Sequence, residues 1–181
     1  MAGAMTCFGQ GDVAAALSHA QQALQLFERT GNRAGQAWAL NSIGFDHALL
    51  GDGQAGLAYC RRALDLSREL GARSYEAETL DSLGYVQTRL RHHDQAIGYY
   101  LQAYDIFGGM DRRGDQARVL TNLGDAQLAF GETQAAITAW QQAVAIFDEL
   151  QHPGAELARG KLRDLGGPEA AGRAPAKIGH R

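Results

Sequence analysis

The chain has 181 residues, of which 45% are hydrophobic and 20% are charged, and its formal net charge is -3. This weak negative charge does not predict a nucleic-acid surface, because such surfaces are basic. No apolar run reaches the roughly 18 residues that a membrane span needs, and the N-terminus lacks a charged segment followed by an apolar one. We therefore expect a cytoplasmic protein that binds neither membranes nor nucleic acid.

The two cysteines, Cys7 and Cys60, lie far apart and form no Cys-x-x-Cys pair. This spacing argues against both a disulfide framework and a zinc site. We interpret both as thiols in the core.

A repeat of 40 residues organises the chain, because one short pattern recurs at equal steps (124 minus 84, and 84 minus 44). The pattern is Leu-x-x-Leu-Gly, with isoleucine in one copy. It occurs at Leu40, Ile43 and Gly44, at Leu80, Leu83 and Gly84, and at Leu120, Leu123 and Gly124. A fixed period predicts stacked structural units rather than one globular core.

Apolar spacing and turn residues predict a partial repeat at 1–33, full repeats at 34–73, 74–113 and 114–153, a capping helix at 154–165 and a disordered tail at 166–181. The helices are expected at about 13–29, 34–50, 54–70, 75–90, 95–107, 114–130, 134–150 and 154–165. Residues 1–9 align with the second half of a first helix, so the first unit lacks its beginning.

Turn signals separate these helices. Gly11-Asp12 precedes the first helix, residues 30–32 end that helix, and residues 51–53 end the second. The pairs His92-His93 and Gly108-Gly109 are expected to lie in a turn and in a helix break.

Each repeat has a glycine in the middle of its first helix, at Gly44, Gly84 and Gly124. A glycine there costs about 1 kcal/mol relative to alanine, so we expect a close approach of the partner helix to compensate. Tyr100 and Trp140 are expected to fill the space between successive helix pairs.

The chain resembles the tetratricopeptide repeat family. The resemblance rests on the Leu-x-x-Leu-Gly pattern followed by Ala96, Tyr100 and Ala103 and by Ala136, Trp140 and Ala143. It implies an all-α, right-handed solenoid of antiparallel helix pairs, with about 3.5 repeats, a C-terminal capping helix and a concave groove that holds a partner. The period of 40 is longer than the usual roughly 34.

Residues 139–162 resemble the closing repeats of actinobacterial regulators of the AfsR-like antibiotic-regulatory class. This resemblance implies the regulatory or sensing segment of a transcription regulator. The phosphate-binding loop and the recognition helix of such regulators have no counterpart in the sequence.

The groove face of each first helix lies opposite its buried stripe. The predicted partner-binding residues are Trp38, Asn41, Phe45, Leu49, Asp81, Tyr85, Arg89, Asn122 and Asp125. Trp38, Phe45 and Tyr85 are the expected anchors, since exposed aromatic residues dominate many interfaces. The favoured function is therefore protein or peptide binding in this groove.

Two alternatives stay open. The incomplete first unit could dock onto another copy, giving a self-assembly module. A more distant alternative is a metal-binding or enzymatic protein using His92 and His93, which lack further ligands at a fixed spacing. We predict no cofactor, no catalytic residue and no metal, and interpret His47 as a packing residue.

Overall fold

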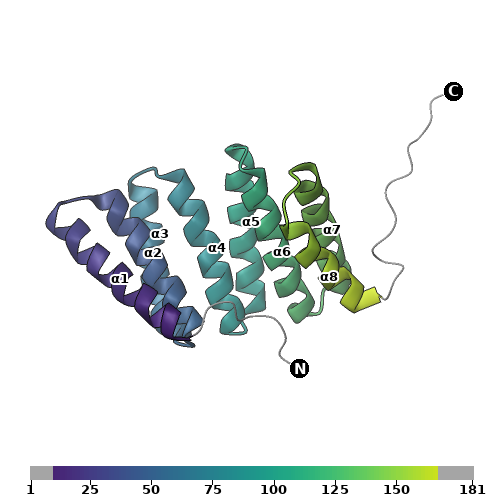
Figure 1. Cartoon of the computed structure of the whole chain (residues 1–181), viewed down its shortest axis with the longest axis horizontal. Helices are drawn as coiled ribbons and strands as arrows, with labels where there is room; N and C mark the ends of the chain where they lie inside the picture. The colour runs from purple at the N-terminus through teal and green to yellow at the C-terminus, as the bar shows by residue number, and fades with distance from the viewer. Residues whose placement is uncertain (1–9, 167–181) are drawn as a thin grey trace.

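The computed structural model describes residues 10–166, and these form eight α-helices and no strand (Figure 1). The helices are α1 (Gln10–Arg29), α2 (Arg33–Leu49), α3 (Gly53–Glu69), α4 (Arg73–Arg89), α5 (His93–Gly109), α6 (Arg113–Phe130), α7 (Thr133–Glu149) and α8 (Gly154–Gly166). They stack in chain order along the long axis of the molecule (Figure 1). The predicted all-α solenoid of antiparallel helix pairs is confirmed. Two predictions, a core position for Cys7 and a disordered tail, fall largely on residues outside this range.

The helices from α2 to α7 begin at every twentieth residue, so the two helices of a pair have nearly the same length. A residue with left-handed backbone geometry reverses the chain in each turn. These residues are Gly31, Gly51, Gly71, Arg91, Asp111, Gly131 and Gln151. The side chains of Asn32 and Asp52 then accept hydrogen bonds from the backbone amides of Gly35 and Ala55, at 2.9 and 3.1 Å, and so cap α2 and α3.

The predicted turn at Gly11-Asp12 is wrong, because α1 begins at Gln10 and both residues are helical. An acidic residue such as Asp12 is favourable in the first turn of a helix as well as at its cap.

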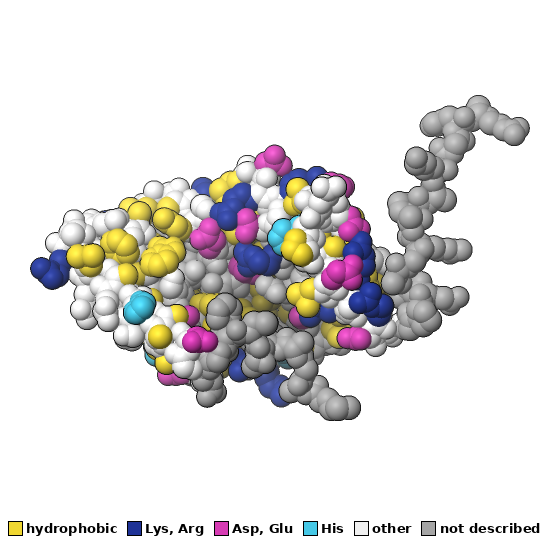
Figure 2. Space-filling model, in the orientation of Figure 1, with side chains coloured by type: hydrophobic (Ala, Val, Ile, Leu, Met, Phe, Trp, Pro, Cys, Tyr) yellow, Lys and Arg dark blue, Asp and Glu magenta, His cyan; other side chains and the backbone are white. Residues whose placement is uncertain are grey.

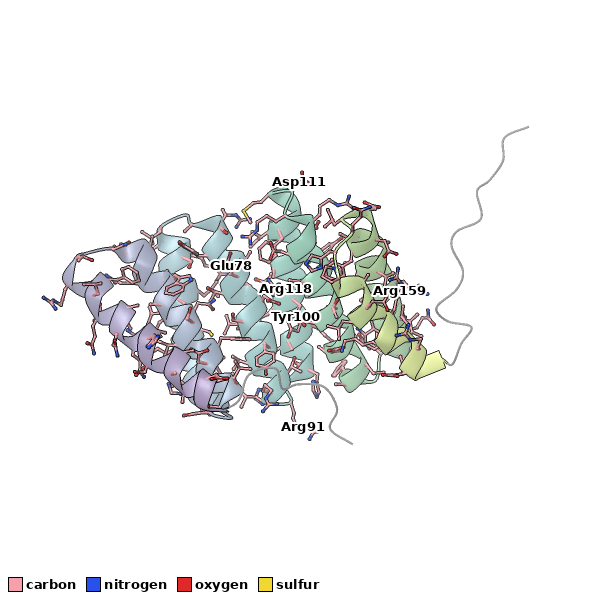
Figure 3. All side chains as sticks on the ribbon, in the orientation of Figure 1. Glu78, Arg91, Tyr100, Asp111, Arg118 and Arg159 are labelled. Atoms are coloured by element: carbon pink, nitrogen blue, oxygen red, sulfur yellow. The ribbon has the colours of Figure 1, made fainter. Side chains whose placement is uncertain are left out.

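The predicted break at Gly108-Gly109 is also wrong, since α5 continues through both glycines and is followed by its C-cap residue, Met110. The reversal comes instead at Asp111, which has a φ of 54°. Likewise His93 is helical, because the preceding reversal is at Arg91, with a φ of 64°. The position of each reversal therefore follows the spacing of the repeat and not the local presence of glycine. Figure 3 shows Arg91 and Asp111 near opposite ends of α5.

The mid-helix glycines serve two kinds of contact. A Cβ on Gly44 would lie 2.9 Å from both the Gly56 carbonyl oxygen and the Cys60 backbone nitrogen, so here the two backbones approach closely. A Cβ on Gly84 would lie 2.5 Å from Cε1 of Tyr100. In that unit the missing side chain makes room for an aromatic ring.

Trp140 occupies the same place beside Gly124, where an added Cβ would lie 2.4 Å from Nε1 of the indole. Its ring donates a hydrogen bond to the Thr121 carbonyl oxygen at 3.1 Å. Trp140 also shares a hydrophobic cluster with Leu162 of α8, so it lies between its own helix pair and the next helix. Tyr100 and Trp140 both pack against the mid-helix glycine of their own pair, a contact that the prediction did not include. The physical reason is that the glycine faces the partner helix of its own unit.

The first helices of successive units form the inner side of the curve. α2 contacts α4, and α4 contacts α6, whereas no contact of this extent joins α3 to α5 or α5 to α7. Helices that lie closer together are on the concave side of a solenoid, so α2, α4 and α6 line the groove. None of the helices described is long and apolar enough to cross a membrane.

The two ends differ. Ala16 on α1 is exposed, while the equivalent Ala96 and Ala136 are fully buried. Leu26 is 55% exposed on the same helix. At the other end α8 buries Ala155, Ala158 and Leu162 against the last unit. The array thus has a covered C-terminal end and an N-terminal helix with little of its surface buried.

Candidate functional site in the concave groove

Two adjoining cavities lie along the groove. The central cavity, of about 590 Å³, is lined by Asn41, Ser42, Phe45, Asp46, Leu49, Glu78, Asp81, Ser82, Tyr85, Arg118 and Asn122. The C-terminal cavity, of about 470 Å³, is lined by Gly114, Asp115, Arg118, Thr121, Asn122, Phe147, His152, Gly154 and Leu157. Because Arg118 and Asn122 belong to both, the two cavities form one continuous groove from α2 to α8.

An aromatic pair lines the central cavity. The ring centroids of Phe45 on α2 and Tyr85 on α4 are 5.0 Å apart and the rings are tilted by 48°. Aromatic rings prefer tilted or offset contacts at this distance. The two equivalent positions of adjacent repeats therefore present one joint aromatic surface, as the sequence predicted for these residues.

An ion-pair network connects α4 to α6 across the groove. Arg118 binds the Asp81 carboxylate, and Arg112 binds Glu78 at 2.9 Å. Asp115 bridges the two arginines, at 2.7 Å from Arg112 and 3.2 Å from Arg118. Figure 3 shows Glu78 and Arg118 in the middle of the solenoid.

Further bonds complete this network. The Asn122 amide donates to Asp81 at 3.2 Å, and the Ser74 hydroxyl donates to Glu78 at 3.3 Å. Burial lowers the pKa of Arg118, but Asp81 and Asp115 outweigh that effect and the net pKa is raised. The carboxylates of Glu78 and Asp81 thus already have cationic partners within the protein.

The C-terminal cavity has a more apolar wall. Phe147 stacks on His152 with 4.9 Å between centroids, and the side chain of Leu157 on α8 is left 60% exposed beside them. The Lys161 ammonium binds Asp125 at 2.7 Å and so fixes α8 to α6. Burial raises the pKa of Asp125, and Lys161 offsets part of that effect.

Six of the nine predicted groove residues line the central cavity, and three line neither of the two cavities. The six are Asn41, Phe45, Leu49, Asp81, Tyr85 and Asn122, and the three are Trp38, Arg89 and Asp125. Asp125 forms an ion pair with Lys161, while Trp38 is 44% exposed on the N-terminal side. Figure 2 shows hydrophobic side chains gathered over α1 and α2, and acidic and basic ones over the helices from α4 to α8.

Several lining residues were not in the predicted site. Asp46 differs from the apolar residues at its equivalent positions, a signal that comparison of the repeats could have found. Arg118 was also left out, although it lies about one helical turn before the predicted Asn122 on α6. Leu157 could not be found from the repeat, because α8 packs in a rotated register in which Ala155 and Leu162 face inward.

The residues considered for metal or nucleophilic chemistry have other contacts. The His92 imidazole contacts the Gln87 side chain at 3.0 Å, and His47 stacks on Tyr59 with 5.5 Å between centroids. Burial raises the pKa of the Cys60 thiol to about 12, so this thiol stays protonated at neutral pH. Within residues 10–166 no group of three or more histidine, cysteine or acidic side chains has metal-site geometry.

The sequence model of the tetratricopeptide repeat family matches residues 36–108. No curated protein matches the chain in sequence. Among solved structures, a Rap protein complexed with Competence and Sporulation Factor superposes with a TM-score of 0.76 at 19% identity, covering 84% of this chain and 43% of its own.

Two further structures have the same fold. BtubC from P. vanneervenii superposes with a TM-score of 0.71 at 15% identity, covering 84% of this chain and 65% of its own. A putative kinesin light chain with nearly identical repeats from Podosopora anserina gives 0.69 at 15% identity, covering 85% and 77%. The chain spans less than half the length of the Rap protein and about two thirds of BtubC. Sequence and structure together support a tetratricopeptide-type repeat scaffold.

Proposed function

We propose, from the tetratricopeptide repeats at residues 36–108, that this chain is a scaffold that binds a peptide or an extended protein segment along its concave groove. The observation that carries the proposal is the continuity of the two cavities through Arg118 and Asn122. A groove lined by residues from five helices fits an extended chain better than a compact small molecule.

The composition of the groove supports this function. The aromatic pair Phe45 and Tyr85 supplies a rigid apolar surface in the central cavity, and Leu157 supplies a second in the C-terminal cavity. Between them the polar side chains Arg118 and Asn122 can contact a ligand backbone. Aromatic anchors with polar neighbours are typical of binding hot spots.

The structural likeness points the same way. The Rap protein of similar fold was solved with a bound factor, and we infer a ligand of the peptide class for this groove by analogy of fold. The contact of His92 with Gln87 and the burial of the Cys60 thiol favour a binding module over an enzyme.

The double variant Phe45→Ala plus Tyr85→Ala is expected to lose the partner that the wild-type protein captures from its source cell. Truncating one hot-spot aromatic residue commonly costs about 2 kcal/mol or more of binding free energy. The measurement is a pull-down followed by titration of the captured partner, after circular dichroism confirms that both proteins are folded.

Phe130→Ala is the matched control, because Phe130 is 53% exposed and lines neither cavity. It should leave the affinity unchanged. Unchanged affinity of the double variant for every partner would show that the groove is not the binding site.

The wider context proposed for this scaffold is the regulatory or sensing segment of a cytoplasmic signalling or transcription protein. Its support is the resemblance of residues 139–162 to the closing repeats of AfsR-like regulators. Direct binding of nucleic acid by this segment is not part of the proposal, since its net charge is negative.

The second candidate function is self-assembly, and the observation that favours it is the exposed apolar surface of α1. Ala16 is exposed where later units bury the equivalent Ala96 and Ala136, and Leu26 on the same helix is 55% exposed. If copies associate through this helix, light scattering should show a mass that rises with protein concentration, and Leu26→Glu should abolish the rise. A constant monomer mass would exclude this function.

A further inference from the structure

Asp46 breaks the apolar pattern of the repeat. Its equivalents one and two repeats later are Val86 and Ala126, and both are fully buried. Asp46 is only 9% exposed and lines the central cavity. The second repeat thus places a carboxylate where the other two place an aliphatic side chain.

Within the part of the chain that the structure describes, residues 10–166, no hydrogen bond or ion pair engages the Asp46 carboxylate. Burial raises its pKa, and the nearby charge of His47 offsets only part of that effect. A buried ionised group without a partner destabilises the folded state, so in most proteins such a group is paired or is neutral.

The other carboxylates of the central cavity differ in this respect. Glu78 is bound by Arg112, and Asp81 is bound by Arg118 and Asn122. A cationic ligand would have to displace those arginines to reach either of them. Among the carboxylates that line this cavity, Asp46 is therefore the one for which no described arginine or lysine forms an ion pair.

The surroundings of Asp46 suit a cation with an apolar stem. Phe45 and Tyr85 line the same cavity, and their rings form a joint surface against which such a stem can lie. Aromatic faces attract lysine and arginine side chains, and this attraction grows when the contact is shielded from water.

We propose that Asp46 recognises a lysine or arginine side chain of the bound peptide, with Phe45 and Tyr85 holding the stem of that side chain. This inference rests on the proposed function, because it assigns the chemistry of one position of the groove ligand. The charge that Asp46 leaves uncompensated in the protein would be paired by the ligand.

The test uses synthetic hexapeptide pools that are acetylated at the N-terminus and amidated at the C-terminus. One central position is fixed as arginine, lysine, citrulline or glutamate, and the others are randomised. Immobilised wild-type protein should retain the arginine and lysine pools about tenfold more than the neutral citrulline pool, as a charge-assisted contact predicts. Asp46→Asn should remove this preference.

Asp65→Asn is the matched control, since Asp65 is exposed on α3 and lines neither cavity. It removes the same charge and should keep the tenfold preference. Asp46→Ala copies the residue found at position 126, and it should raise Tm by about 2–4 °C while losing the preference. A fall in Tm would show that the folded protein already uses this carboxylate, which contradicts the proposal.

The outcomes separate the two proposals. Retention of all pools to the same extent, or a preference for cations that survives Asp46→Asn, would overturn the role of Asp46 and leave the peptide groove standing. Failure of wild-type protein to retain any pool would overturn the peptide groove, and the role of Asp46 with it.

Discussion

Replacing Gly84 with leucine is expected to lower the free energy of unfolding by about 3 kcal/mol, the upper end for an overpacked core. A Cβ at this position would already lie 2.5 Å from Cε1 of Tyr100, and Tyr100 is itself only 2% exposed. Neither the ring nor the α4 backbone can move without opening the contact between α4 and α5. Thermal and urea unfolding of the variant would measure the loss.

Gly109→Leu is the control for this prediction. Gly109 is the last residue of α5, a Cβ there would meet nothing within 4 Å, and its φ is not positive. Leucine also has a higher helix propensity than glycine, so the control should be as stable as the wild type or slightly more. Equal melting temperatures for the two variants would show that Gly84 is not required for packing.

Trp140→Ala is expected to cost about 3–5 kcal/mol, the range for losing a large buried aromatic side chain. The indole fills the space beside Gly124, is 2% exposed and donates a hydrogen bond to the Thr121 carbonyl oxygen. It also touches the cluster that contains Leu162, so its loss should loosen the capping helix α8. Unfolding curves give the cost, and amide exchange of α8 gives the loosening.

Trp38→Ala serves as the comparison within the same protein. Trp38 is 44% exposed at the N-terminal side of the groove, so its truncation should cost less than about 1 kcal/mol. If the two tryptophan variants were equally destabilised, Trp38 would have to be buried in solution, for example against another copy. That outcome would favour self-assembly through the N-terminal unit.

The fold was largely predictable because its signal recurs. The forty-residue period of Gly44, Gly84 and Gly124 predicted the paired helices, and most helix boundaries fell within a few residues of those observed. The error at Gly108 arose because local turn residues were weighed on their own, whereas the structure turns at every twentieth residue from Gly31 to Gln151, even where that residue is Arg91 or Asp111. The error at Gly11 is different, because Gly11 keeps the twenty-residue spacing from Gly31 and yet lies within α1.

The sequence predicted which helix faces line the groove, but it did not predict which side chains pair with one another there. Helical geometry was enough to place Phe45 and Tyr85 on one surface. Ion pairs between units could not be predicted from helical geometry, because Arg118 lies 37 residues after its partner Asp81 and on another helix. These side-chain directions decide which carboxylates have an arginine partner. The directions are fixed only when the units stack.

The equal spacing of the helices has a consequence for the length of the array. The ion pair between Arg33 and Glu69, at 2.6 Å, recurs two units later between Arg113 and Glu149, at 2.5 Å. A deletion of residues 73–112 would place Arg113 directly after Ala72, where Arg73 now begins a helix. Gain or loss of whole units can therefore lengthen or shorten the ligand that the protein spans, without the need for a new turn.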